Sequence, residues 1–275
     1  MKIPPVKGTR DFYPEQMARR NWIIDGWKKV SLRNGFEEYD GPIFEHLQMY
    51  QLKSGQEIVE QLFSLQDRGG RDLAIRPEIT PTLARMVNQQ INSLPRPIKW
   101  FAVPRLCRAE RPQKGRLREF FQWNVDIIGE DRADADAEII FTTIDYLRSV
   151  GLTAKDIRAK ISSRRLLAAV LTSIGIPAEK LEPVYAVLDK KAKLPPEAFA
   201  AVLAEQVPDE DQAAKIHQFM ALNSVEAVSG IVQPDEALAK AIDELQGVFS
   251  VLKAMGVAEF CGFDPTIVRG LAYYT

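Results

Sequence analysis

Residues 105–129, RLCRAERPQKGRLREFFQWNVDIIG, constrain the fold of this chain more than any other stretch. Between Arg105 and Glu119 there are six Lys or Arg and two Glu, a local charge of +4 in a chain of net charge −1. Pro and Gly break the basic run at 111–115, and a strand-like segment follows over 120–128. Gln122 and Asp126 are four residues apart, so they share a face of that strand. The pattern predicts a cationic hairpin beside a polar-lined strand, which suits an anionic nucleotide and a small polar ligand.

The remaining segments predict an α+β fold. Apolar periodicity and turn residues predict helices over 14–33, 81–90 and 133–150, the first with Trp22, Ile23, Trp27 and Val30 on one stripe. Thr80 is expected to cap the second helix. Strands are predicted over 36–39, 63–65, 73–75, 99–103, 157–162 and 260–264, and residues 269–275 resemble another strand. We therefore expect a mixed, mainly antiparallel sheet flanked by helices.

Composition changes after Arg164, where the chain becomes Ala-rich, helical in pattern and poor in strand signals to about Met255. This pattern indicates a helical insertion into the α+β fold. The expected domains are residues 1–163 as a core, 164–256 as the insertion, and 257–275 as a return to the core.

Several classes of protein are disfavoured by what the sequence lacks. Its 275 residues suffice for one large or two smaller domains. There is no GxGxxG after a strand and no GxxxxGK[ST], which removes the Rossmann and P-loop folds. No apolar run approaches the ~18 residues that span a bilayer, and the first residues lack a signal-peptide pattern, so we expect a cytoplasmic protein without a membrane span. Cys107 and Cys261 are too few for a disulfide framework or a metal site, and we expect no protein-held metal.

Three polar groups are candidates for a site, and each has a plainer alternative. The cations Arg108, Arg111, Lys114, Arg116 and Arg118 could clamp phosphates with Phe120 beside them to stack on a purine, or form a solvated charged loop. The second group comprises Glu78, Thr80, Gln122 and Asp126, and it could bind a small polar ligand. Alternatively, Glu78 and Thr80 form the start of a helix, and Asp126 pairs with an arginine of the fold. The third, Arg269 with Tyr273 and Tyr274, could orient a heterocycle, or be a surface arginine beside edge aromatics.

No nucleophile system is visible. His46 and His217 are the only histidines, and they are far apart in sequence and outside any triad-like pattern. We therefore interpret both as structural.

In their order along the chain, these segments resemble the catalytic domain of histidyl-tRNA synthetase, a class II aminoacyl-tRNA synthetase. The opening KGTRD of residues 7–11 with Pro14 resembles the family's N-terminal signature, and the stretch to Pro42 resembles its motif 1, which builds the dimer interface. Residues 76–80 match its Arg-Pro-Glu-x-Thr segment, residues 108–120 match motif 2, and residues 269–274 match its histidine-binding signature. The resemblance covers essentially the whole chain, and the helical segment falls where this family carries an insertion.

The resemblance implies roles for the candidate residues, with L-histidine, ATP, Mg²⁺ and tRNA(His) as ligands and a homodimer formed through motif 1. Glu78 and Thr80 would hold the α-amino group of histidine, with Gln122 nearby. Asp126 and Tyr274 would bond the imidazole nitrogens, and Tyr273 would line the pocket. Arg108 and Arg269 would grip the carboxylate and the α-phosphate. In the ATP site Glu110 would meet the adenine edge, Phe120 would stack on adenine, and Arg116 would reach the terminal phosphates with Mg²⁺.

The chain also departs from the family pattern. Position 126 is Asp where some members have Glu, and position 272 is Ala where others have Asp. Motif 3 and the anticodon-binding domain would lie beyond Thr275, so we expect this chain by itself to make adenylate poorly. The main alternative is the synthetase-like regulatory subunit of ATP phosphoribosyltransferase, which senses histidine without aminoacylation. A third is a tRNA- or protein-binding pseudo-enzyme.

Overall fold

The structure is a computed structural model, and it describes residues 3–53 and 60–268. The chain forms two compact units, residues 1–130 and residues 131–275, each with its own elements. This division at residue 130 separates two segments that each pack mainly against themselves. The core, insertion and returning core expected from the sequence, with boundaries at 163 and 256, stay predictions.

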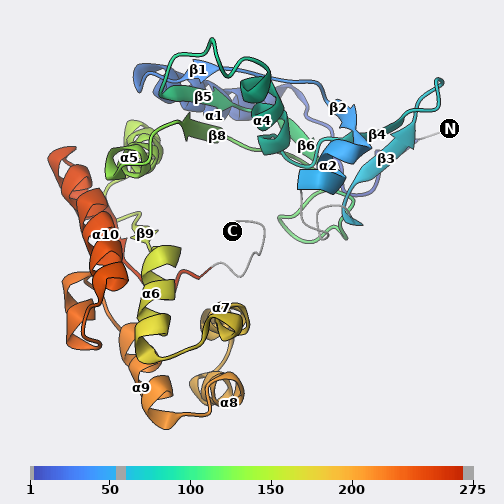
Figure 1. The fold of residues 1–275 in the computed structure, drawn as a ribbon. Coiled ribbons are helices and arrows are strands. Elements are labelled where there is room, and N and C mark those ends of the chain that lie inside the picture. The colour runs from blue at the N-terminus through green and yellow to red at the C-terminus, as the bar shows by residue number, and fades with distance from the viewer. Residues whose placement is uncertain (1–2, 54–59, 269–275) are drawn as a thin grey trace. The chain divides into compact units, whose positions relative to one another are not determined.

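In its described residues, the first unit combines short strands with the helices α1, α2 and α4 (Figure 1). The helix α1 (Pro14–Arg33) leads into β1 (Glu37–Glu38), and β2 (Phe44–His46) leads into α2 (Leu47–Lys53). The hairpin β3 (Phe63–Gln66) and β4 (Asp72–Ile75) precedes α4 (Thr80–Gln89). The strands β5 (Ile98–Ala102), β6 (Arg105–Cys107), β7 (Glu119–Phe121) and β8 (Asn124–Ile128) complete the unit.

These strands form three small sheets. One has the order β1-β5-β8, with β1 parallel and β8 antiparallel to β5; the others are the antiparallel β2-β4-β3 and β6-β7. The sheet β1-β5-β8 packs against α4 through a cluster of buried side chains that includes Ile79, Leu83, Val87, Ile98 and Ala102. The predicted mixed, mainly antiparallel sheet flanked by helices is confirmed in this form, divided into small sheets.

The second unit is mostly helical (Figure 1, green to red). The helix α5 (Ala133–Ser149) is followed by β9 (Ala159–Ile161), by α6 (Arg164–Ile174), α7 (Leu181–Leu188), α8 (Pro196–Gln206) and α9 (Glu210–Phe219), then by α10 (Glu236–Ala254) and β10 (Cys261–Phe263). Short 3₁₀ turns lie at Ala178–Lys180, Lys191–Lys193, Glu226–Gly230 and Ala258–Phe260. Parallel pairing of β9 with β10 brings the two ends of the predicted helical segment together. One large apolar core unites these helices.

The helix predicted over 14–33 is present as α1, and along its apolar stripe Val30 is buried whereas Trp22 is 63% and Ile23 37% exposed. One local prediction about the first unit was wrong. Thr80 does not cap α4: the helix begins at Thr80 itself, with Ile79 at the N-cap and no side-chain cap bond. Pro81, near the helix start, needs no backbone donor there, which lets the helix begin at Thr80.

Candidate functional site

The predicted cationic hairpin exists. The strands β6 and β7 pair antiparallel, with Leu106 opposite Phe120. At its tip the backbones of Gln113 and Arg116 exchange two hydrogen bonds of 3.0 Å each, so Lys114 and Gly115 form the turn. Gly115 has φ +81°, a conformation that glycine adopts without steric cost. The Pro and Gly signals in the sequence therefore located the turn correctly.

A small cavity of about 250 Å³ lies along this hairpin, and its lining contains four of the predicted site residues. The Arg108 guanidinium carbon lies 5.3 Å from the centroid of the Phe120 ring. Arg116 donates to Glu110 Oε1 over 2.9 Å, so one carboxylate neutralises part of the positive charge. The full lining is Arg108, Glu110, Gly115, Arg116, Leu117 and Phe120. Two arginines beside an aromatic ring can hold phosphate oxygens and a planar base.

Not every cation of the hairpin serves this cavity. Arg118 donates through Nε to the Glu110 backbone oxygen (3.0 Å), and its backbone N–H bonds to Gly8 O (2.8 Å). Arg118 therefore ties the hairpin to itself and to the N-terminal segment, and its predicted role as a phosphate clamp gives way to a structural one. Arg111 and Lys114 are exposed beside the turn.

Arg108 also links the hairpin to the segment that precedes α4. Its Nε donates to the Pro77 backbone oxygen over 3.2 Å, and the Cys107 N–H donates to Arg76 O over 3.0 Å. Glu78, which is half-buried, directly follows Pro77, the residue that accepts the bond from Arg108. Thr80 is exposed at the start of α4. The structure thus brings the segment that carries Glu78 and Thr80 beside Arg108 of the first predicted group.

Arg76 is a positioning residue that the sequence reasoning did not single out. Its side chain is almost fully buried and makes three hydrogen bonds, to Arg105 O (3.1 Å), Asp40 Oδ1 (2.7 Å) and Gly41 O (2.8 Å). It therefore joins the turn after β1 to the hairpin strand β6. The available signal for this role was an arginine directly after the apolar strand 73–75, a position where the side chain is expected to be buried. A buried arginine needs several hydrogen-bond acceptors, so it joins segments that are distant in sequence.

Asp126 lies in the middle of β8, opposite Trp100 of β5. Its Oδ2 is buried and has no hydrogen-bond partner in the described part of the chain. Burial raises the pKa of this carboxyl from 3.8 to about 6, because the charged form loses its solvation. The alternative that Asp126 pairs with an arginine of the fold finds no support among the described residues, and a ligand with an N–H group could supply the missing bond.

The predicted strand over 120–128 is interrupted. Residues 119–121 belong to β7 and pair with β6, whereas residues 124–128 belong to β8 and pair with β5. Gln122 lies exposed in the break, with its N–H directed to Pro104 O at 3.3 Å. Because the strand is broken between Phe121 and Asn124, the prediction that Gln122 and Asp126 share one face of a continuous strand was wrong. Arg269, Tyr273 and Tyr274 lie outside the described residues.

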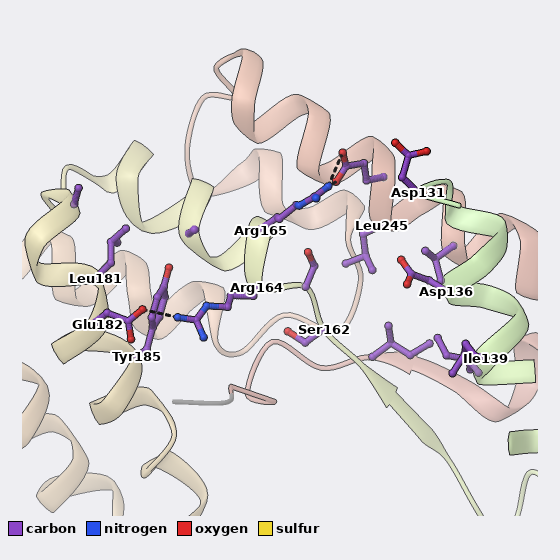
Figure 2. A pocket seen from close by; sticks show the side chains of 17 residues that line it. Asp131, Asp136, Ile139, Ser162, Arg164, Arg165, Leu181, Glu182, Tyr185 and Leu245 are labelled. Atoms are coloured by element: carbon purple, nitrogen blue, oxygen red, sulfur yellow. Dashed lines mark hydrogen bonds and ion pairs between the residues drawn. The ribbon is translucent and has the colours of Figure 1, made fainter. Parts of the chain in front are cut away.

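A second and larger cavity, of about 960 Å³, lies within residues 131–248 and contains none of the predicted site residues (Figure 2). Its arginines are already engaged: Arg164 pairs with Glu182, and Arg165 Nη1 lies 3.1 Å from Glu244 Oε2. Paired charges offer an anion or a cation little net attraction. The hairpin cavity and Asp126 therefore remain the candidate site.

Within residues 3–53 and 60–268, no cluster of three or more His, Cys, Asp or Glu side chains could hold a metal ion. None of the helices described has the length and apolar content that a bilayer crossing requires.

Comparison with known proteins connects this geometry to one family. A family model described as histidyl-tRNA synthetase matches residues 8–275. A chloroplastic/mitochondrial histidine–tRNA ligase of Arabidopsis thaliana is 39% identical over 99% of this chain, and a histidine–tRNA ligase of Haloarcula marismortui is 41% identical over 98%. The chain spans 56% and 62% of the lengths of these two relatives.

Solved structures show the same fold. A histidyl-tRNA synthetase from Nostoc sp. PCC 7120 superposes with a TM-score of 0.87 at 20% identity, covering 98% of this chain and 63% of that one. A protein from Bacillus halodurans described as an ATP phosphoribosyltransferase regulatory subunit/histidyl-tRNA synthetase gives 0.83 at 24% identity, covering 98% and 70%. At these identities the likeness concerns the fold, the class II synthetase fold expected from the sequence.

Proposed function

Because the chain belongs to the histidyl-tRNA synthetase family, we propose that it serves the ATP-dependent activation of L-histidine and the ligation of histidine to tRNA(His). The observation that carries this proposal is the position of Arg108. Its guanidinium faces Phe120 in the hairpin cavity, and its Nε bonds to the residue before Glu78. One cation thus lies between a cavity suited to a nucleotide and a segment suited to an amino acid.

The proposed reaction has two steps. A carboxylate oxygen of histidine attacks the α-phosphorus of ATP, the bond to the bridging oxygen breaks, and histidyl-adenylate and pyrophosphate form. The histidyl group then passes to a 3′-terminal hydroxyl of tRNA, and AMP leaves. Arg108 would stabilise charge on the α-phosphate and carboxylate, and Arg116 would bind the terminal phosphates. Fixed positive charge at the reacting phosphate is the main contribution expected of the protein.

The adenine and the amino acid would be held by the remaining candidates. Phe120 would stack on the base and Glu110 would meet its edge. Glu78 and Thr80, with Gln122 nearby, would bind the α-amino group, and Asp126 would accept a bond from the imidazole ring. The resemblance adds Arg269, Tyr273 and Tyr274, which lie outside the described residues.

Mg²⁺ would enter as the ATP complex. Glu110 is the one carboxylate in the described lining of the hairpin cavity, and it already pairs with Arg116. Mg²⁺ in nucleotide sites is commonly bound through phosphate oxygens and one or two carboxylates. The residues present therefore suit a metal carried by the substrate.

The proposal includes a cytoplasmic homodimer formed through motif 1. Trp22 and Leu32 of α1 are 63% and 59% exposed, and large apolar side chains on one helix are typical of an interaction surface. The regulatory subunit of ATP phosphoribosyltransferase remains the alternative function, favoured by the name of the Bacillus halodurans protein.

Calorimetric titration of the 275-residue chain with ATP and with L-histidine tests these functions. We expect binding of both, and at least tenfold weaker ATP binding in Arg108→Ala. Arg111→Ala, an exposed arginine of the same hairpin, is the matched control and should change ATP affinity less than about twofold. Binding of histidine without ATP would favour the regulatory alternative, and binding of neither would contradict the proposal.

A further inference from the structure

Three polar residues lie on one face of the sheet β1-β5-β8. Glu38 pairs with Phe101, so Tyr39 comes next beside Ala102, and the Tyr39 N–H continues the pairing by bonding to Phe101 O over 2.9 Å. Ala102 in turn lies opposite Asn124. Residues directly opposite in a sheet share a face, and so do residues two apart on a strand. Tyr39, Asn124 and Asp126 therefore lie on the same face.

Each of the three has a buried polar atom that makes no hydrogen bond to the described residues. These atoms are Tyr39 Oη, Asn124 Oδ1 and Asp126 Oδ2. Tyr39 itself is only 8% exposed, and the side chain at Ala102, between β1 and β8, is a single methyl group. A buried polar group without a partner lowers folding stability, and native proteins keep few of them. Three on one face indicate a surface built for a ligand rather than for stability.

The chemistry of the three atoms is complementary. The Tyr39 hydroxyl can donate, whereas Asn124 Oδ1 and an ionised Asp126 can only accept. The pKa of Tyr39 is raised by burial and, to a smaller extent, by the Asp126 and Asp40 carboxylates, against a lowering by Arg76. The Tyr39 hydroxyl therefore stays protonated at neutral pH and lies within the electrostatic reach of Asp126. Asp40 and Arg76 are the other charged groups at this tyrosine.

We propose that Tyr39 is a positioning residue for Asp126, whose hydroxyl donates a hydrogen bond to that carboxylate when the carboxylate ionises to receive a ring N–H of the substrate. The inference rests on the proposed function of the same pocket and adds a determinant of its specificity. A carboxylate held by Tyr39 on one oxygen presents the other oxygen to the ligand. The pocket then selects an amino acid with an N–H-bearing ring over one with an apolar ring of similar size, because the apolar ring would leave a buried carboxylate unbonded.

The first test needs no ligand. In the 275-residue chain, the Asp126 carboxyl is titrated by carbon NMR in wild type and in Tyr39→Phe. A hydrogen bond to the charged form favours ionisation, so its removal should lower the acid dissociation constant of Asp126 about tenfold. Tyr50→Phe is the matched control, since Tyr50 is fully buried in the same unit and its hydroxyl interacts with Glu45, Glu78 and Thr82 rather than with Asp126. Identical titrations of wild type and Tyr39→Phe would overturn the inference.

The second test measures L-histidine binding and thermal stability of the same variants. Tyr39→Phe should bind L-histidine about tenfold more weakly, as loss of one hydrogen bond to a charged group implies. Its unfolding temperature should be unchanged or higher, because the hydroxyl makes no bond in the free protein. A shifted Asp126 titration in a chain that binds no histidine would refute the proposed function and leave the Tyr39–Asp126 coupling intact. If Tyr39→Phe lowered stability without shifting the Asp126 titration, the role of Tyr39 would be purely structural and the inference would be overturned.

Discussion

Replacing Asp126 with Asn is expected to stabilise the first unit at neutral pH and to have little effect near pH 4. The reason is the burial that raises the pKa of this carboxyl from 3.8 to about 6. The folded protein then holds the proton more tightly than the unfolded chain does. Near pH 4 and below, the folded state carries the neutral carboxyl, and its stability is intact. As the pH rises from about 4 to about 6, the unfolded chain ionises while the folded state keeps its proton, so stability falls, and above the folded pKa the loss is complete.

The size of the effect follows from the two pKa values. The difference between 6 and 3.8, at roughly 1.4 kcal/mol for each pH unit, gives about 3 kcal/mol at pH 7 and above. Asn has nearly the shape of a protonated Asp and never ionises. It should therefore recover most of this free energy at neutral pH.

Urea denaturation followed by tryptophan fluorescence measures the effect in the relevant part of the molecule. All four tryptophans, Trp22, Trp27, Trp100 and Trp123, belong to the unit of residues 1–130. Asp67→Asn is the control of opposite sign: the Asp67 carboxylate accepts bonds from Arg71 and Gly69, which lower its pKa. Asp67→Asn should therefore not stabilise the protein at neutral pH. A free-energy difference for Asp126→Asn that is equal at about pH 4 and about pH 7.5 would refute the reasoning.

Three further predictions concern the framework around the site. Arg76→Met should lower the free energy of unfolding by about 3 kcal/mol in the same fluorescence assay, since it removes three hydrogen bonds of a buried arginine. Replacement of the exposed Arg71 by Met should change the free energy of unfolding by less than about 0.5 kcal/mol. Gly8→Ala should weaken ATP binding at least fivefold in calorimetry, because φ is +88° and a Cβ would lie 2.7 Å from Pro112 Cγ in the hairpin loop, whereas Gly151→Ala, at φ +92° with open space, should not. Trp22→Glu should shift the chain from dimer to monomer in light scattering, and a monomeric wild type would contradict the proposed homodimer.

Much of the hairpin could be predicted because its signals are local. Pro and Gly at 111–115 marked the turn, and the basic residues around it identified Arg108 and Arg116 as cavity residues. The break in the strand after Phe121 could not be predicted in this way, because it coincides with contacts distant in sequence. The Trp123 ring stacks on Trp27 at 5.8 Å, and its Nε1 donates to Ser31 Oγ over 3.0 Å. The segment 120–128 retains β-prone residues on both sides of that contact.

The positioning residues were missed for a related reason. Arg76 matters through acceptors at Asp40, Gly41 and Arg105, which lie about thirty or more residues away in sequence. Tyr39 lies on the same face as Asn124 and Asp126 only because β5 lies between β1 and β8. Cross-strand register of this kind depends on the whole sheet, and no short motif encodes it.

The three contacts of Arg108 have an entropic consequence. Its backbone N–H bonds to Arg118 O over 2.8 Å, its Nε bonds to Pro77 O, and its guanidinium lies over Phe120. A free arginine side chain carries about 2 kcal/mol of rotamer entropy, which a ligand must overcome when it orders the group. Here that ordering takes place during folding, before any ligand arrives. A phosphate bound as proposed would therefore meet a cation that is already oriented, and more of the attraction between them would remain as binding free energy.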